Sequence, residues 1–413
     1  MTPPCNCVHL RYERSANPTR RVGKIVYLLY TFKLKIMTDQ LDIQKLAYAL
    51  IIVVLLTYIS IVASSIILPF LFGLLFMLLL HPICNRVEKI ISNRVIAIFI
   101  TFCVVLFPLV GIFVFFSSQF VDIFENTTSL SEKMNSGIQT LFQWINEKLG
   151  LTNANSEKWL QENASKFLET PAVFIGKSIS SSSAFLGNFA LCLLYCFFLL
   201  LYRQSFKTFF LYQVSKSERK ATEELIYRIQ KIVQEYLSGL AIVMILLGII
   251  NSIGLYFIGI SYSFFWGFLA AFLAIIPYIG TFIGGFLTFI FTLATTSGFI
   301  QPLLVVALFV TVQALEGNII TPKIVGSSVK INPLAAIFSI VIGGTIWGVS
   351  GLILSIPLIA ILRILMKQFD YFKPLSLLLG DDIYDREDIF ERKYDQEKFR
   401  LINFFTKQNT PND

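Results

Sequence analysis

Residues 274–290 read AIIPYIGTFIGGFLTFI, a lipid-soluble stretch that contains no charged side chain. Pro277 and Gly280 lie near its centre, where they disturb a helix most. Proline lacks a backbone N–H and clashes with the preceding turn, and glycine permits the chain to reverse direction. The stretch therefore predicts a non-helical turn at residues 277–280, buried in the membrane-embedded part of the protein, with Tyr278 facing a cavity or a subunit interface.

The segments on either side of this turn are short for membrane helices. Residues 262–276 would extend about 22 Å and residues 281–296 about 24 Å, whereas a full span needs about 30 Å. Irregular backbone at membrane depth is tolerated where it is buried in protein or lines a wet cavity. We expect a re-entrant hairpin here; the alternative is an ordinary loop between two full spans. Residues 333–362, interrupted by GGTIWGVSG (343–351) and by Pro357, are the candidate for a second broken hairpin.

The charged residues of the whole chain are few and clustered. Of 413 residues, 55% are hydrophobic and 15% are charged, and the mean hydropathy is +0.70; an ordinary soluble domain carries about 25% charged residues. Five stretches contain no Asp, Glu, Lys or Arg: residues 46–85, 95–121, 178–202, 236–315 and 331–362. Apolar runs longer than about 18 residues are typical of transmembrane helices. The sequence therefore predicts an all-α, polytopic helical membrane protein with about eight transmembrane segments.

The net charge of +8 does not indicate a nucleic-acid partner. The lysines and arginines lie mostly beside the apolar runs, as the positive-inside rule predicts, and no basic stripe with interleaved aromatic residues is present. Cys5, Cys7 and His9 lack a second pair of ligands at zinc-like spacing. No zinc-protease, serine-hydrolase or phosphate-loop motif occurs in the chain. We therefore expect no enzyme, no metal site and no cofactor.

The N-terminal part of the chain divides at Met37. Residues 1–36 are basic and irregular, and their short apolar part does not fit a signal peptide. We expect residues 1–36 to be a non-native N-terminal extension and residues 37–121 to hold the N-terminal membrane helices. The run 46–85 predicts two short helices joined by a tight turn, and the basic residues that follow it place the next loop in the cytoplasm.

The remaining chain divides into three parts. Residues 122–183 are polar and amphipathic, with seven acidic residues against five lysines, and this balance predicts an external segment on the membrane surface. Residues 184–365 predict the main membrane domain, which includes a basic, amphipathic cytoplasmic helix at residues 204–236. Residues 366–413 carry charges of both signs and predict a cytoplasmic tail. Both termini of this multi-pass protein are then expected in the cytoplasm.

One acidic residue lies within the apolar C-terminal half. Glu316 is the only charged residue between Glu235 and Lys323, and acidic side chains at membrane depth are costly and usually functional. A helix that starts near Gln301 and spans would place Glu316 about 6 Å from its end. Two interpretations stay open. Glu316 is an interfacial acid paired with Lys323, or it lines a path and contacts a substrate or a coupling cation.

The C-terminal half also resembles a known family. It is similar to the signature region of the autoinducer-2 exporter family, also described as PerM-like permeases, and the resemblance covers roughly residues 37–372. The motifs that carry it are YLSGL (236–240), IPYIG (276–280), LEGNIITPKIVGSSVKINPL (315–334) and GGTIWGVSGLILSIPLIAILRIL (343–365). The chain departs from the family pattern at Thr281, where proline is common, and at Asn332, where histidine is common.

The resemblance implies a permease that exports small molecules, with autoinducer-2, a small polar diol, as the name-giving substrate. Three functions stay open: an exporter of such a metabolite, a sodium (cation)/proton antiporter that would depend on Glu316, and a non-transporting membrane scaffold. Because glycines give the apolar helices small faces for close packing, we also expect a homo-oligomer in the lipid bilayer. The candidate substrate path consists of polar and helix-breaking residues: Asn251, Pro277, Tyr278, Gly280, Thr281, Glu316, Asn318 and Pro322.

Overall fold

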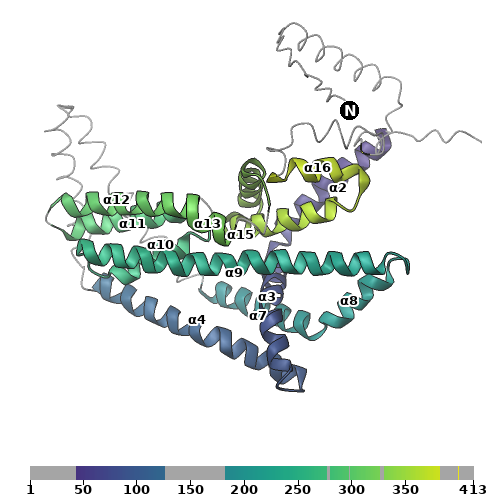
Figure 1. Cartoon of the computed structure of the whole chain (residues 1–413), viewed down its shortest axis with the longest axis horizontal. Coiled ribbons are helices and arrows are strands. Elements are labelled where there is room, and N and C mark those ends of the chain that lie inside the picture. Colours follow the sequence, from purple (N-terminus) through teal and green to yellow (C-terminus); the bar gives the residue numbers. More distant parts are fainter. Residues whose placement is uncertain are drawn as a thin grey trace, which may run out of the picture.

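The computed structural model describes residues 43–125, 182–276, 280–296, 298–325 and 330–381, together with Phe399. The longer helices are α2 (Ile43–Val62), α3 (Ser64–Glu88), α4 (Arg94–Glu125), α7 (Ser182–Leu201), α8 (Arg203–Tyr212), α9 (Arg219–Ile258), α10 (Ser263–Leu273), α11 (Gly280–Thr295), α12 (Ile300–Leu315) and α15 (Pro333–Met366) (Figure 1). The short elements are η1 (Glu316–Ile320), α13 (Thr321–Ile324), η2 (Asp370–Phe372) and α16 (Lys373–Leu378). In this part of the chain the all-α prediction is confirmed, since the only pairing of extended backbone is an isolated bridge between Ile331 and Gly380.

Six helical segments among the described residues are long and apolar enough to cross a membrane, and a seventh follows if the bent pair α7–α8 is one span. These six are α2, α3, α4, α9, the run from α12 through α13, and α15. α10 and α11 are apolar but have only 11 and 16 residues. The polytopic helical membrane fold is therefore confirmed. The expected number of eight spans is not, because the helices beside the break at residues 277–280 are too short to cross alone.

The N-terminal helices pack around α3. α3 and α7 approach closely at Gly73, where a Cβ would lie 2.9 Å from the Cys192 carbonyl oxygen. α2 does not fold back along α3: Ala63 alone separates the two helices, and the apolar side chains of α2 are exposed on all sides (Figure 1). The tight turn expected within residues 46–85 is therefore wrong. One residue with near-helical dihedral angles (φ −91°, ψ 17°) bends the chain without reversing it.

α9 is the central element of the fold. It has 40 residues, or a length of about 60 Å at helical rise, and it joins a basic, amphipathic first part to an apolar second part. α10 packs on the second part, where a Cβ at Gly267 would lie 2.5 Å from the Ser252 backbone nitrogen. The α12–α13 run packs on another side of α9 and is antiparallel to it, because Leu308 contacts α9 at Gly254 and Val325 contacts it at Gly239.

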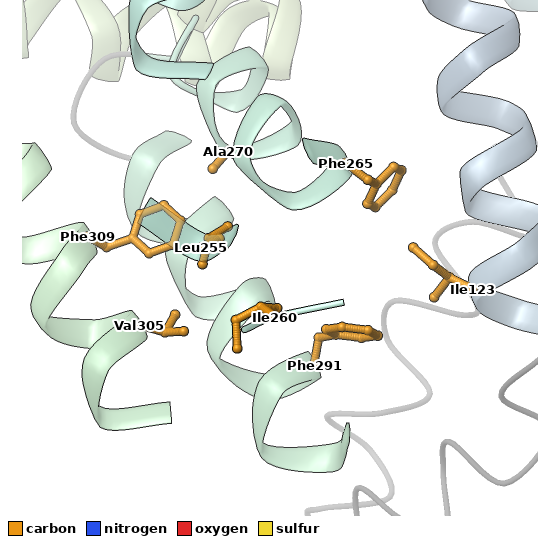
Figure 2. Packing of buried hydrophobic residues seen from close by; sticks show 8 residues of the cluster. All are labelled: Ile123, Leu255, Ile260, Phe265, Ala270, Phe291, Val305 and Phe309. Atoms are coloured by element: carbon orange, nitrogen blue, oxygen red, sulfur yellow. The ribbon is translucent and has the colours of Figure 1, made fainter. Parts of the chain in front are cut away.

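A buried apolar cluster surrounds the end of α9 (Figure 2). Its side chains come from α4, from α9 and the loop that follows it, and from α10, α11 and α12: Ile123, Leu255, Ile260, Phe265, Ala270, Phe291, Val305 and Phe309. Because lipid tails are as apolar as these side chains, close packing rather than exclusion from water stabilises such a cluster in a membrane. The cluster fixes the start of α10 and the end of α11 against α9 and α12.

α10 and α11 form a helical hairpin, here called hairpin 1 (residues 263–295). α10 ends at Leu273 and α11 begins at Gly280, and a Cβ at Gly280 would overlap the Leu273 carbonyl group. Further along the two arms, a Cβ at Gly284 would lie 2.6 Å from the Ala270 Cβ. The predicted helix break is therefore confirmed. Residues 277–279 themselves, and with them the orientation of Tyr278, lie outside the described residues.

α15 is also a hairpin, here called hairpin 2 (residues 333–366). Gly348 interrupts it with φ 59° and ψ −138°, dihedral angles that only glycine adopts readily. In a straight helix, residues eight apart are separated by about 12 Å, yet a Cβ at Gly343 would lie only 2.6 Å from the Gly351 carbonyl oxygen. The chain therefore folds back at Gly348, which confirms the second broken hairpin. Trp347 donates from Nε1 to the Ser60 carbonyl of α2 at 2.8 Å.

The two hairpins start from opposite ends of the bundle. Hairpin 1 connects the end of α9 to the start of α12, and hairpin 2 follows the far end of the antiparallel α12–α13 run. The predictions for residues 1–36, for the external segment beyond residue 125 and for the tail beyond residue 381 fall outside the described residues, Phe399 excepted. Those predictions stay predictions.

Candidate functional site

The helical run from α12 to α13 widens at Glu316. Residues Glu316–Ile320 form the π-helical turn η1, in which the Thr321 backbone N–H bonds the Glu316 carbonyl five residues back. The wider turn changes the partners of nearby carbonyls, and Asn318 Nδ2 donates to the Ala314 carbonyl at 2.8 Å. Single π turns inside α-helices are rare and occur frequently at functional sites. The candidate acid therefore sits where the helix is least regular.

Glu316 meets the tip of hairpin 1. Thr281, the second residue of α11, donates from Oγ1 to Glu316 Oε2 at 3.4 Å. Thr281 is buried, at 6% exposure, and Glu316 is half-buried. The separation is at the long end of the range for hydrogen bonds, so the contact is weak and easily broken. The structure thus brings together two candidate path residues that lie 35 positions apart in the sequence.

The alternative in which Glu316 pairs with Lys323 is not supported. Within the described residues, Glu316 forms an ion pair with no lysine or arginine. Lys323 is exposed on α13, and its side chain does not reach the carboxylate. Glu316 therefore lies within the membrane-length run Ile300–Ile324, about 12 Å before its end. The Thr281 hydroxyl is its one hydrogen-bonding side chain in this part of the chain.

Asn251 is buried without hydrogen-bond partners. It is 1% exposed, and neither Oδ1 nor Nδ2 bonds to any described residue. One helical turn before it and one turn after it, Leu247 and Leu255 pack against α10 and α12 in two buried clusters. Asn251 therefore lies on the face of α9 that is turned toward these helices. An unpaired buried polar group costs about 1–3 kcal/mol and calls for an explanation, such as a bound polar ligand or water.

Asn251 is separate from the Thr281–Glu316 contact. No hydrogen bond among the described residues joins the Asn251 amide to Thr281 or to Glu316.

The remaining candidate residues differ in position. Gly280 permits the close approach of the two arms of hairpin 1. Asn318 and Pro322 are exposed, and Pro322 has no N–H for the carbonyl four residues before it, which favours the irregular η1–α13 segment. Pro277 and Tyr278 lie outside the described residues.

Sequence reasoning missed a polar stripe on α11. Thr288 and Thr292 are fully buried, and each hydroxyl donates to the carbonyl four residues before it, at 2.8 Å. Together with Thr281 and Thr295 they recur at spacings of seven, four and three residues, which places them on one face of the helix. That spacing is visible in TFIGGFLTFIFTLAT and could have identified the stripe. The hydroxyl oxygens keep capacity to accept further hydrogen bonds.

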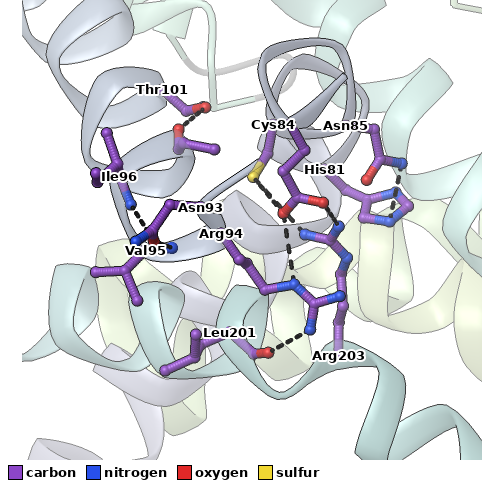
Figure 3. A network of polar contacts seen from close by, with 12 residues as sticks. His81, Cys84, Asn85, Asn93, Arg94, Val95, Ile96, Thr101, Leu201 and Arg203 are labelled. Atoms are coloured by element: carbon purple, nitrogen blue, oxygen red, sulfur yellow. Dashed lines mark hydrogen bonds and ion pairs between the residues drawn. The ribbon is translucent and has the colours of Figure 1, made fainter. Parts of the chain in front are cut away.

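A second polar cluster joins the N-terminal helices α3 and α4 to α8 (Figure 3). Arg203, at the start of α8, donates to Glu88 at 2.5 Å, and Arg94 lies 3.7 Å from the same carboxylate. His81 of α3 contacts Gln230 of α9. Because every charge here has a partner of opposite sign and the contacts join four helices, this cluster fits a structural junction and not a substrate path.

A buried arginine holds the base of hairpin 2. Arg363 is 4% exposed; its Nε donates to the Ser376 carbonyl at 3.1 Å, and one of its terminal nitrogens donates to the Lys330 carbonyl. Asn332 caps α15 by accepting from Ala335 N at 2.7 Å, and its Nδ2 also donates to the carbonyl of Leu378, the last residue of α16, and to that of Gly380. The sequence had suggested only that a charge ends the apolar run. The structure shows a clamp that joins both ends of hairpin 2.

Membrane-length helices, two broken helical hairpins and polar groups at a hairpin tip define a class, that of polytopic membrane transport proteins. Residues 50–370 match the family described as AI-2E family transporter, and the chain therefore belongs to this family.

Named relatives agree with this assignment. The chain is 25% identical over 321 residues to the AI-2 transport protein TqsA of Escherichia coli (strain K12), a match that covers 77% of this chain and 90% of the relative. It is 22% identical over 339 residues to the putative transport protein YueF of Bacillus subtilis (strain 168), with the same coverage. A shorter match, 31% identical over 159 residues, joins 38% of this chain to 44% of the putative transport protein YrrI of Bacillus subtilis.

Proposed function

We propose that this protein is a permease of the bacterial cytoplasmic membrane that exports a small polar metabolite of the autoinducer-2 type. The single observation that carries the proposal is the contact between Thr281 and Glu316. It joins the tip of a broken hairpin to a π turn, and both kinds of irregular backbone are associated with substrate paths in membrane proteins. A relative with 90% of its length matched is named for autoinducer-2 transport.

The chemistry of the proposed path suits an uncharged polar solute. Its groups are hydroxyls on α11, the amide of Asn251 and one carboxylate, with backbone carbonyls near the break at residues 277–280. Hydroxyls and amides both donate and accept hydrogen bonds, as a diol requires. The proposal includes no enzymatic step and no cofactor.

Cation/proton antiport is the second candidate function, and Glu316 favours it. A carboxylate without an ion pair in the described part of the chain can exchange a proton for a cation at little structural cost. Antiport and export make different predictions about ion gradients, so one assay separates them.

Flux into proteoliposomes of the purified full-length protein tests the proposal. Uptake of labelled autoinducer-2 and of sodium would be measured in parallel, each with and without a proton gradient. Metabolite flux above protein-free liposomes supports the permease. Sodium flux that requires the proton gradient, without metabolite flux, identifies the antiporter. If neither solute moves in protein shown to be folded, the scaffold interpretation replaces both.

Glu316→Gln keeps the shape of the side chain and removes its charge. We expect at least a tenfold loss of transport and a flattened pH dependence, because the carboxylate that would bind the solute or the ion loses its charge. A hydrogen bond to a charged group contributes about 1.5–3 kcal/mol. Glu235→Gln is the matched control, since Glu235 is exposed on α9 and pairs only with Lys231 at 3.8 Å. Unchanged transport and pH dependence in folded Glu316→Gln protein would show that the acid is structural, and the antiport candidate would lose its basis.

We further propose that the working form is a homo-oligomer. The 18-residue apolar window of α2 has no residue buried by the described chain, which leaves a whole helix for lipid or for a second copy. Light scattering in mild detergent would show a mass above one chain plus its micelle. A monodisperse monomer that retains transport would contradict this.

A further inference from the structure

The helix after α7 leaves the direction of the membrane span. α7 is apolar and ends at Leu201, and α8 begins at Arg203 with a bend of 63° between the two axes. If α7 follows the bilayer normal, α8 makes an angle of about 27° with the membrane plane. Membrane helices tilt by about 20° on average. α8 is therefore directed along the membrane surface and not into the cytoplasm.

α8 exposes its aromatic side chains. None of its residues is buried, and the exposed fractions are 46% for Phe206, 57% for Phe209 and 54% for Phe210. At 100° per residue these three side chains lie on one face. Tyr202, one turn before Phe206, extends that face and is 51% exposed. Three phenylalanines on one exposed face of a ten-residue helix are costly in water.

One flank of α8, beside the aromatic face, is bound to the protein. Arg203 pairs with Glu88 of α3 at 2.5 Å, and Lys207 pairs with Glu223 of α9 at 2.5 Å. At the end of the helix, the Arg219 guanidinium lies 4.4 Å from the centre of the Tyr212 ring. These contacts fix the rotation of α8, and in that rotation the aromatic face stays exposed.

We propose that α8 lies on an anionic lipid surface, with its aromatic face in the interface between headgroups and acyl chains. Three observations choose lipid as the occupant. The aromatic face is separated from a membrane span by one residue. Residues 203–236 carry seven Lys and Arg against four Glu, the charge that anionic lipid attracts. Lys216 and Lys220, beside α8, are exposed and form no ion pair among the described residues.

This combination is typical of helices that lie in a membrane interface, which bury aromatic side chains and present basic residues to the headgroups. A second copy of this chain is the other possible occupant. It would have to cover the aromatic face while tolerating the adjacent uncompensated lysines. The proposal does not depend on the transported solute, so it stands or fails separately from the proposed function.

Photo-crosslinking of the full-length protein in nanodiscs identifies the occupant directly. Benzoylphenylalanine would replace Phe209, or in a second variant Gln204, which is exposed and lies about 200° around the helix from Phe206. The nanodiscs contain phosphatidylcholine and phosphatidylglycerol in a ratio of two to one. After irradiation, mass spectrometry of the intact protein distinguishes lipid adducts from crosslinked chains.

We expect lipid adducts at position 209 at least about fivefold above those at position 204, with phosphatidylglycerol over-represented relative to its share of the bilayer. Lys216→Gln combined with Lys220→Gln should lower that over-representation by about twofold to fivefold without lowering the total adduct yield. Crosslinked chains at position 209 would assign the face to a second copy and overturn the proposal. Equal lipid adducts at both positions, or none at position 209, would also overturn it.

Discussion

Hairpin 1 and hairpin 2 are both broken helices, but different contacts hold them. The tip of hairpin 1 reaches the α12–η1 junction through one long hydrogen bond, from Thr281 to Glu316. Hairpin 2 is clamped at its base by Arg363 and Asn332, which bond to carbonyls on both sides of it, and its tip bonds to α2 through Trp347. Arg363 and Asn332 make several hydrogen bonds to backbone at hairpin 2, although one terminal nitrogen of Arg363 bonds to no described atom. At hairpin 1, Asn251 and the Trp266 Nε1 have no hydrogen-bond partner among the described residues.

This difference indicates which hairpin moves. Breaking several hydrogen bonds to a buried guanidinium costs much free energy, whereas breaking the one long hydrogen bond at 3.4 Å costs little. Asn251, beside hairpin 1, lacks partners in this conformation and would gain them from a ligand, from water or from another arrangement of the helices. We infer that hairpin 2 is part of the rigid frame and that hairpin 1 is the gate of the proposed path. Four predictions test this comparison.

Gly351→Val should have the largest effect. A Cβ at this position would overlap the Gly343 carbonyl across hairpin 2, and the second arm cannot shift while Arg363 is clamped. Overpacking commonly costs about 1–3 kcal/mol, and a clash with backbone exceeds that. We expect loss of folded protein, measured as monodisperse yield in detergent. Gly187→Val is the control, because nothing lies within 4 Å of a Cβ there. Normal yield of both variants would contradict the antiparallel hairpin.

Arg363→Met should destabilise the protein by about 2–4 kcal/mol, because the Ser376 and Lys330 carbonyls lose a charged donor at once. The melting temperature in detergent should fall clearly, and Arg363→Lys should recover only part of the loss, since an ammonium group cannot copy the planar geometry of guanidinium. Arg228, exposed on α9, provides the control substitution to methionine. A melting temperature equal to that of the control would remove hairpin 2 from the rigid frame.

Substitution by leucine should change the stability of the protein in opposite directions at two asparagines. Asn251→Leu removes an unpaired buried amide and should raise stability by about 1–3 kcal/mol while transport falls. Asn332→Leu removes a helix cap and bonds to two carbonyls, and should lower stability by about 1–2 kcal/mol. Melting temperatures and flux would be measured on both. Destabilisation by both substitutions would mean that Asn251 is satisfied in the membrane and would weaken its place in the path.

Thr281→Val should have the smallest effect. It removes the hydroxyl and keeps the volume, so at most one weak hydrogen bond of about 0.5–1.5 kcal/mol is lost. We expect an unchanged melting temperature and a change of up to about tenfold in flux, because the contact that closes the gate is gone. Thr311→Val is the matched control, since Thr311 is exposed on α12 and bonds only within its own helix. Equal flux in the two variants would separate hairpin 1 from gating.

Local sequence was a good guide to helices, breaks and membrane depth. Pro277 and Gly280 located the break of hairpin 1, the glycines around residue 348 located that of hairpin 2, and the long charge-free runs identified a membrane protein. Glu316 was also found from sequence, because one acid in a long apolar stretch is conspicuous. These properties depend on backbone restrictions and hydropathy, which neighbouring residues determine together.

The partners of these residues could not be found in the same way. Thr281 and Glu316 are 35 positions apart, and only the packing of α11 against α12 selects which of many polar side chains meet. Arg363 was assigned no role from the sequence, because its acceptors come from segments on both sides of hairpin 2. Two further features depend on which helix faces meet: the bend from α2 to α3, which does not reverse the chain, and the unpaired amide of Asn251. Helix crossing and close packing decide those faces, and hydropathy along one helix does not encode them.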